Sequence, residues 1–530
     1  MYAIKDDVEL LAQDPLAGAP LQKAECYPKQ PQAFSPASLF SRSKSFPSIL
    51  YLGLVRASSE LVPSFIVRRW LPDLIVTPLP SPKIHSTSWL DGLRGVAALS
   101  VVMFHWAGFI LASIDAGYGL LPSSTFLQLP FIKLVHSGMA DVTLFFVISG
   151  YALSIRPVQL MSHPGANEAA LLRSYSSSIF RRMLRLYIPA WASTIVPWLW
   201  IVLKMDSLTG RARMWSFVSS RQYQKAVTAL HDPFYEHIEA SAHLKRADVP
   251  STSIIGELQK WTTENFRSLT IFEGSWSRGT YQNLYNPPMW TIPVEFRASL
   301  LLFLVQIAVT RFRISWRILI TTGLILWSVY ADRFEVILFL AGFLCAQLDP
   351  IMTHFEARLE TSIKATKLYK LFMVVVLVIG MYLASSPLVD PEHTPGYSWL
   401  TKHIPTTFIL FKVWFWPSVG GILIVFAISR LPTISRIFTL ASFQYLGQIS
   451  FSIYLVHWFI EMTFGCWFMY SFTYLTRNLD RHNDGLFLLG FGISSLGIAA
   501  LVICAGDVWC RLVDIPSVKF AKWIESNMLE

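Results

Sequence analysis

The chain has 530 residues, of which 53% are hydrophobic and only 15% are charged, whereas soluble domains carry about 25% charged residues. This composition excludes a soluble globular domain and predicts an all-α protein that crosses a membrane several times. Lysine and arginine exceed aspartate and glutamate by ten. Basic loops facing an anionic membrane surface explain this excess, so we expect a lipid bilayer and no nucleic acid as a partner.

The cysteines and the N-terminus limit the class of protein further. The five cysteines show neither CxxC nor Cys/His ligand spacing, so we expect no disulfide framework and no metal site. The first residues, MYAIKDDVELLAQDP, lack a basic head followed by an apolar core, which argues against a cleaved signal peptide.

Composition divides the chain into four parts. Residues 1–46 are rich in Pro, Ser, Ala and Gln and predict a disordered cytosolic segment. Residues 47–88 mix short apolar runs with arginines and prolines, which favours an amphipathic piece at the membrane interface followed by a stiff connector. A transmembrane domain follows over 89–510, with a cytosolic tail at 511–530.

About ten apolar runs are candidate membrane spans. Runs 317–331 and 334–348 are short enough to form one re-entrant pair instead. Basic residues concentrate in alternate short loops, so both termini are expected in the cytosol and the long loop 205–289 in the lumen or outside. The candidate spans are 93–113, 139–155, 186–204, 290–310, 317–331, 334–348, 371–388, 406–428, 443–469 and 486–506.

The first span carries an unusual histidine. Asp91-Gly-Leu-Arg94-Gly opens an apolar helix that contains His105, and a histidine in hydrocarbon is costly unless it is paired or used. Eleven residues separate Arg94 from His105, which places both on nearly one face, about 16 Å apart. His105 is either a structural residue bonded to a neighbouring helix or a general base. Arg94 is expected near the membrane surface.

Two further arginines open the third span. Arg182 and Arg185 lie at i, i+3 and share a helix face. Each alone reads as an ordinary positive-inside anchor, but paired guanidinium forks also suit the recognition of phosphate groups.

Acidic and histidine residues occur in later spans as well. Glu295 begins the fourth span, where it either pairs with Arg297 on its own helix or extends its carboxylate to the interface. As a functional residue it would orient the histidine or bind an acceptor hydroxyl. His457 and Glu461 lie at i, i+4 in the ninth span and are expected to satisfy each other. Ser149, beside Gly150 in the second span, reads first as a close-packing position.

Five ordered segments, LDGLRGVAALSVVMFHW, DVTLFFVISGYALS, FRRMLRLYIPAW, MWTIPVEF and FSIYLVH, resemble the membrane-bound acyltransferase-3 family, and its fungal branch most closely. The resemblance covers about residues 88–510 and implies about ten transmembrane helices. It also implies transfer of an acyl group, often acetyl from acyl-CoA, to a hydroxyl group.

The resemblance assigns roles to residues of this chain. The family's Arg-x10-His signature falls on Arg94 and His105, and its Arg-x-x-Arg signature on Arg182 and Arg185. We therefore expect these arginines to bind acyl-CoA. His105 and Glu295 are expected to be catalytic, with Glu295 on the acceptor side. Asp91, Ser149, His457 and Glu461 are expected to serve substrate binding or structure.

The acceptor is left open by the sequence. The absence of an appended soluble domain favours a small membrane-soluble metabolite such as a terpenoid or polyketide, with a polysaccharide or lipid as the alternative. A proton-coupled transporter that uses the same ionisable residues is an alternative of another class. The short spans favour an endomembrane such as the endoplasmic reticulum over the plasma membrane.

Overall fold

In the part of the chain that it describes, the computed structural model consists of helices and the segments that connect them, and it contains no strand there. The described residues are 63–64, 79, 84–111, 114–120, 124–162, 168–203, 253–271, 282–476 and 484–528. The expected disordered segment 1–46 lies outside them, as does most of 47–88. An all-α fold is confirmed.

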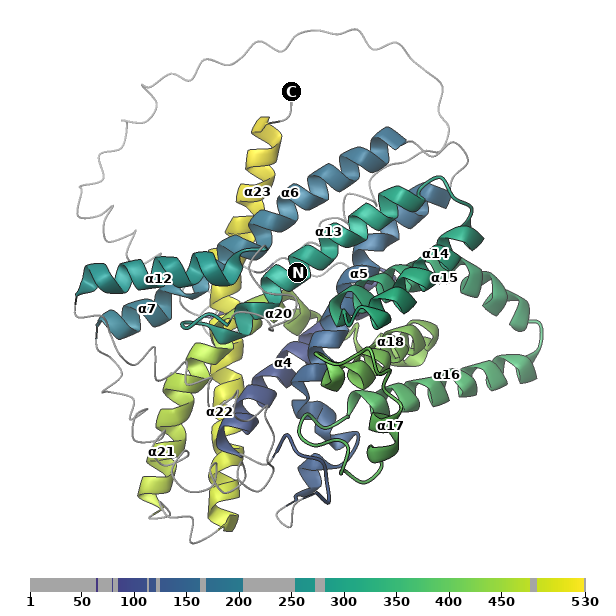
Figure 1. Ribbon diagram of the computed structural model, residues 1–530. Coiled ribbons are helices and arrows are strands. Elements are labelled where there is room, and N and C mark those ends of the chain that lie inside the picture. Colours follow the sequence, from purple (N-terminus) through teal and green to yellow (C-terminus); the bar gives the residue numbers. More distant parts are fainter. Residues whose placement is uncertain are drawn as a thin grey trace, which may run out of the picture.

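The α-helices form one crowded bundle with several peripheral helices (Figure 1). In chain order they are α4 (Ser88–Ile110), α5 (Gly138–Ser162), α6 (Glu168–Ser193), α7 (Ile195–Val202), α12 (Ile254–Leu269), α13 (Thr291–Val309), α14 (Ile314–Tyr330), α15 (Phe334–Leu359), α16 (Ile363–Ala384), α17 (Ser398–Lys402), α18 (Phe415–Arg430), α19 (Pro432–Ile437), α20 (Ala441–Ile460), α21 (Cys466–Leu475), α22 (Asp484–Trp509) and α23 (Ile515–Met528).

Eight helical segments in the described residues are long and apolar enough to cross a membrane. They match eight of the ten expected spans. The run 186–204 instead falls on α6 and α7, which are separated at Thr194, and the run 317–331 falls on α14, a shorter apolar helix of 17 residues. The eight segments are Ser88–Ile110, Gly138–Ser162, Pro287–Val309, Phe334–Leu359, Ile363–Ala384, Lys412–Arg430, Ala441–Met469 and Gly485–Met528.

Helices α4 and α20 run in the same direction and touch backbone to backbone. A Cβ on Gly447 would lie 2.4 Å from the carbonyl oxygen of Asp91, and one on Gly95 would lie 2.6 Å from the backbone nitrogen of Gly447. Only glycine permits such an approach. Gly95 thus admits α20 as a close neighbour.

Helices α5, α13 and α15 also run parallel to one another. Ser149 and Ser154 of α5 contact Glu295 and Gln306 of α13 respectively, so both helices advance in the same sense. Gly150 packs against the backbone of Phe339 in α15, which confirms its packing role. Parallel neighbours require the chain to return between them, and α6–α7 and α14 occupy the two returns.

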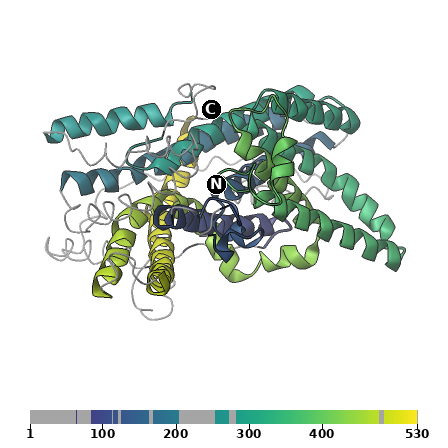
Figure 2. The same ribbon diagram turned by 60° about the horizontal axis from the view of Figure 1, so that its bottom comes forward.

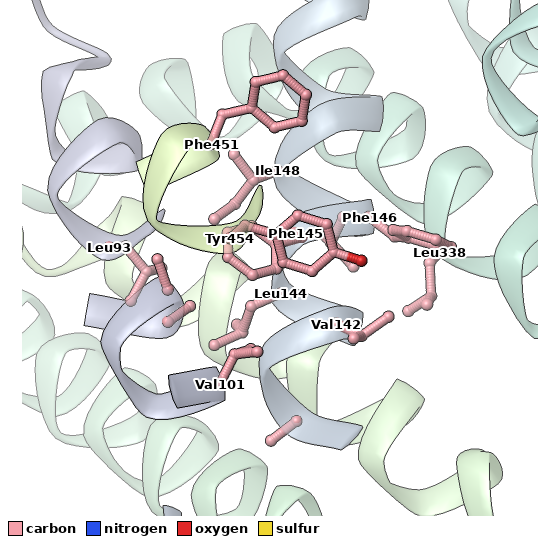
Figure 3. Close-up of a cluster of buried hydrophobic side chains, with 14 of the residues drawn as sticks. Leu93, Val101, Val142, Leu144, Phe145, Phe146, Ile148, Leu338, Phe451 and Tyr454 are labelled. Carbon is pink, nitrogen blue, oxygen red and sulfur yellow. The ribbon is translucent and has the colours of Figure 1, made fainter. Parts of the chain in front are cut away.

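The core is apolar and lies where α4, α5, α15 and α20 meet (Figure 3). Phe146 of α5 contacts Phe334 and Phe339 of α15 through their rings. Phe451 and Leu93 complete the cluster from α20 and α4. This packing fixes the four helices that carry most of the candidate site.

The segment expected as a cytosolic tail continues α22 as a helix. A π-helical turn, η9 (Cys510–Asp514), joins α22 to α23, and α23 lies beside α6 (Figure 1). Arg181 of α6 pairs with Glu525 of α23 at 3.3 Å. The residues that follow the last span are therefore packed against the helix that carries Arg182 and Arg185.

Candidate active site

His105 lies against α20 near the far end of α4. Its ring centroid is 5.3 Å from that of His457, with the two rings stacked, and 5.4 Å from that of Trp458, with the rings edge to face. His105 is partly buried, whereas His457 has no exposed surface. Of the two imidazoles, that of His105 is therefore the more accessible to a substrate.

His457 is oriented by its own helix. Its Nδ1 lies 3.3 Å from the carbonyl oxygen of Ile453, one turn earlier. A carbonyl accepts hydrogen bonds, so in the neutral ring Nδ1 carries the proton and Nε2 is an acceptor. Nε2 has no hydrogen-bond partner among the described residues.

Glu461 begins a π-helical turn, η8 (Glu461–Gly465), at the end of α20. The residue is fully buried, and neither carboxyl oxygen has a hydrogen-bond partner within the described part of the chain. The expectation that His457 and Glu461 satisfy each other is wrong, because the acceptor nitrogen of His457 and both oxygens of Glu461 lack partners there. Spacing of i, i+4 brings side chains to one face but does not ensure a bond.

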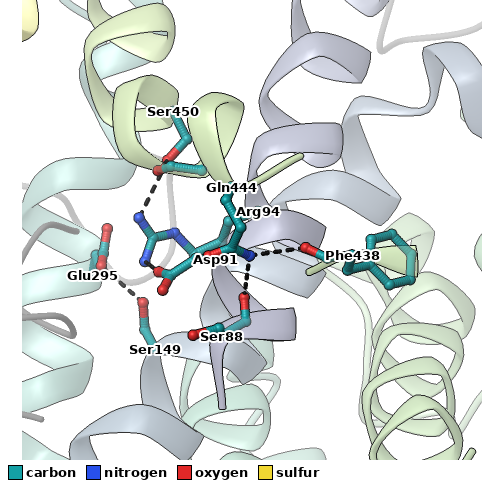
Figure 4. A network of polar contacts seen from close by, with 9 residues as sticks. Ser88, Asp91, Arg94, Ser149, Glu295, Phe438, Gln444 and Ser450 are labelled. Carbon is teal, nitrogen blue, oxygen red and sulfur yellow. Dashed lines mark hydrogen bonds and ion pairs between the residues drawn. The ribbon is translucent and has the colours of Figure 1, made fainter. Parts of the chain in front are cut away.

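Arg94 is held between its own helix and α20 (Figure 4). Its guanidinium donates to Asp91 Oδ1 and to Ser450 Oγ, both at 3.2 Å. Because Arg94 and His105 contact Ser450 and His457 of the same helix, the sequence prediction that they share a face is confirmed. The arginine is only 1% exposed, so neighbouring helices enclose its guanidinium.

Glu295 of α13 joins the arginines rather than the histidines. Its Oε1 accepts a hydrogen bond from Arg182 at 2.7 Å and another from Ser149 at 3.1 Å. Figure 4 shows this carboxylate beside the Asp91–Arg94 pair. Arg297, the partner considered from the sequence, instead donates to the backbone oxygen of Ile271 at 3.4 Å.

Arg185 completes a layer of buried charge. Arg182 and Arg185 are 2% and 4% exposed, so the face that they share points into the bundle. Asp514 of η9, itself buried, interacts electrostatically with Arg185 and Arg94. Three arginines thus lie among three carboxylates, those of Asp91, Glu295 and Asp514, and this balance offsets the cost of burying the charges.

Tyr454 connects the charged layer with the histidines. Its hydroxyl lies 2.6 Å from Thr291 Oγ1 and also contacts the backbone oxygen of Pro288. Its ring centroid is 5.8 Å from that of His457, and it interacts electrostatically with Glu295. The sequence contained a signal for Tyr454, because it lies three residues before His457 on the same helix face.

Two other contributors had no such signal. Asp514 lies beyond the last expected span, where nothing in the pattern links it to the first. Asn286, just before α13, donates from Nδ2 to Ser193 Oγ and to the carbonyl oxygen of Leu455, both at 2.9 Å. It thereby ties the start of α13 to the turn of α20 that precedes His457.

A metal centre finds no support in the described residues, where no group of three or more His, Cys, Asp or Glu side chains could hold a metal ion. The chemical groups present are an accessible imidazole on α4, a second imidazole stacked on it from α20, and three buried arginines, Arg94 of α4 and Arg182 and Arg185 of α6. This set suits proton transfer next to a bound anion.

A family model described as an acyltransferase domain matches residues 87–505, and the chain belongs to this acyltransferase-3 family. The match includes each of the five ordered motifs, so the resemblance read from the sequence is confirmed. The protein is therefore a multi-pass membrane acyltransferase.

The chain is similar to three fungal enzymes along most of its length. It is 28% identical to acyltransferase R4 of a Phoma species, and the alignment covers 84% of this chain and 97% of that protein. Acyltransferase clz18 of Cochliobolus lunatus is 26% identical, with 84% and 96% covered. The O-acetyltransferase PaAT-1 of Phomopsis amygdali is 27% identical, with 84% and 86% covered. No solved structure matches.

Proposed function

We propose that this acyltransferase moves an acetyl group from acetyl-CoA to a hydroxyl group of a small, membrane-soluble metabolite. The observation that carries the proposal is the partly buried His105 stacked on the fully buried His457, in a bundle that also buries Arg94, Arg182 and Arg185. A relative named as an O-acetyltransferase, PaAT-1, supports acetyl as the group and oxygen as its acceptor. An endomembrane is the proposed location.

His105 is the proposed general base. The acceptor hydroxyl gives its proton to the imidazole while its oxygen attacks the thioester carbonyl carbon. The carbon–sulfur bond then breaks, and the proton passes from the imidazolium to the leaving thiolate of CoA. His457, stacked on His105, restricts the orientation of the imidazole, which is what a base needs in order to act at one fixed atom.

The three arginines are the proposed donor site. Acyl-CoA carries several phosphate groups, and guanidinium forks recognise phosphate through paired hydrogen bonds. Arg94 and His105 lie eleven residues apart on one face, about 16 Å along the helix, which leaves room for an extended arm between phosphates and thioester. Because all three arginines are buried, the elements that cover them must open for the donor to enter.

Glu295 acts in this proposal through Arg182. Its hydrogen bond to Arg182 and the one that it accepts from Ser149 fix the guanidinium within the bundle. It is therefore a positioning residue for the donor site, and the acceptor-side role expected from the sequence has no contact to support it in the described residues.

Donor binding is tested by Arg185→Ala with Arg181→Ala as its matched control. Arg181 lies on the same helix but pairs with Glu525 of α23, so its removal should leave the KM for acetyl-CoA unchanged. Arg185→Ala should raise that KM at least tenfold, with activity recovered at high acetyl-CoA. An unchanged donor KM in Arg185→Ala would contradict the assignment.

A further inference from the structure

Helix α12 lies within the stretch expected as a water-facing loop, and it turns a polar face toward the protein. Glu257, Asn265 and Ser268 are 2%, 1% and 3% exposed. They lie at helical spacing on one side. Leu269 is the one apolar residue buried with them. A soluble protein would direct mostly apolar residues inward at such positions, so the inward face of this helix is unusually polar.

Each inward polar group has a partner in the body of the protein. Tyr285 donates to Glu257 Oε1 at 2.7 Å, and Asn283 Nδ2 donates to Ser268 Oγ at 2.8 Å. Thr194, at the junction of α6 and α7, receives a bond from Trp261 Nε1 at 2.9 Å. These bonds fix the rotation of α12 about its axis.

The fixed rotation places an apolar stripe on the outside. Ile255, Leu258 and Phe266 are 71%, 45% and 66% exposed, and positions 255, 258 and 266 fall within an arc of about 80° at 100° per residue. The neighbouring outer arc is polar and exposed, with Gln259, Thr263 and Arg267. The exposed surface of α12 is therefore itself amphipathic.

The apolar stripe belongs to a larger apolar surface. Helix α7 runs beside α12 in both views (Figures 1 and 2) and exposes Ile195, Val196 and Leu199. Tryptophans 191 and 198 of the α6–α7 pair pack against Trp261 of α12. A cluster of tryptophans beside exposed aliphatic side chains is typical of the boundary between hydrocarbon and headgroups.

We propose that α12 lies along one surface of the bilayer, with the Ile255/Leu258/Phe266 stripe in lipid and the Gln259/Thr263/Arg267 arc toward water. The occupant of the stripe is lipid because the stripe continues the apolar surface of α7 and has a polar arc on only one side. A water-facing helix would have the opposite polarity, with its polar residues outward and apolar residues inward.

This placement connects the membrane surface to the catalytic end of the bundle. Tyr285, which holds Glu257, is followed by Asn286, and Asn286 donates to the carbonyl oxygen of Leu455. Leu455 lies two residues before His457. The lipid-bound α12 thus holds the segment Tyr285–Asn286, which bonds to α20 just before His457. This arrangement does not depend on which acceptor or donor the enzyme uses.

Spin-label accessibility in proteoliposomes tests the placement without any assay of activity. Nitroxides are attached at Ile255→Cys, Leu258→Cys and Phe266→Cys, with Gln259→Cys and Thr263→Cys as matched controls on the same helix. Native cysteines are replaced by alanine. If that chain does not fold, genetically encoded p-acetylphenylalanine carries the label at the same positions. Collision rates with oxygen and with nickel-EDDA are then compared.

Lipid exposure predicts a ratio of oxygen to nickel-EDDA collisions several-fold higher at the stripe than at the control positions, because oxygen concentrates in hydrocarbon and nickel-EDDA in water. Similar, nickel-dominated ratios at all five positions would place the helix in water and overturn the proposal. Low collision rates with both reagents at the stripe would also overturn it, since they indicate a second copy of the chain or another protein.

Discussion

Among single residues, the Arg182–Glu295 pair combines full burial with a short hydrogen bond and joins α6 to α13. Arg182→Met should destabilise the protein by about 3–5 kcal/mol, because it removes the cation from a buried carboxylate. A lower melting temperature in detergent would report this loss.

The double variant Arg182→Met/Glu295→Leu is the control for that change. It buries no unpaired charge, so it should recover most of the stability that the single variant loses, while remaining impaired in acyl transfer. If the double variant were less stable than Arg182→Met, the pair would not be coupled as the structure indicates.

Lys133, in the connection between α4 and α5, gives a pH-dependent prediction. Burial lowers its pKa to about 8, partly opposed by Asp115, and its Nζ donates to the backbone oxygens of Ile114 and Asp115. Between pH 8 and about 10.4 the unfolded chain binds more protons at this site than the folded protein does. The contribution of Lys133 to the free energy of unfolding therefore rises with pH in this range.

The comparison with Lys133→Met isolates this effect. The free energy of unfolding, measured by denaturant titration from pH 7 to 10, should increase with pH in the wild type relative to the variant, by at most about 1.4 kcal/mol per pH unit. Parallel curves for the two proteins would show that the Lys133 ammonium is not desolvated in the folded state.

At the scale of helices, the close packing of α4 against α20 keeps Arg94 beside Ser450 and His105 beside His457. Gly447→Ala would place a methyl group 2.4 Å from the backbone oxygen of Asp91, and such overpacking costs about 1–3 kcal/mol. We expect a lower melting temperature and reduced acyl transfer.

Gly323→Ala in α14 is the matched substitution. A Cβ there meets no atom of the described residues within 4 Å, so better helix propensity should leave stability unchanged or raised by up to about 1 kcal/mol. Equal losses of stability and activity in the two variants would mean that the glycine contact between α4 and α20 does not contribute specifically to either.

The sequence was sufficient to predict the long apolar helices but not their rotation, and it did not predict α12 or α23. Arg94 and His105 belong to one helix, so spacing alone placed them on one face. Glu295 lies on a different helix from its partner Arg182, and no pattern within α13 sets which neighbour its first turn meets. His457 and Glu461 show the converse error, since correct spacing led to a bond that the structure lacks. The structure also put Asp514, beyond the last expected span, beside the arginines.

For the whole molecule, helix directions bear on topology. The parallel course of α5, α13 and α15 requires α6–α7 and α14 to return the chain, although neither is among the eight long apolar segments. We predict that both cross the membrane and that the two termini lie on the same side. Protease protection of N- and C-terminal tags in sealed vesicles should give one shared pattern, and opposite patterns would contradict it.

The central claim is that His105 carries acyl transfer. The direct measurement incubates the reconstituted protein with radiolabelled acetyl-CoA and a panel of hydroxylated terpenoids and polyketides, and follows label into ester products. The wild type should form labelled ester. His105→Ala should form none above background, and an unchanged melting temperature should show that this variant is folded. Label transfer by His105→Ala at the wild-type rate would contradict the account.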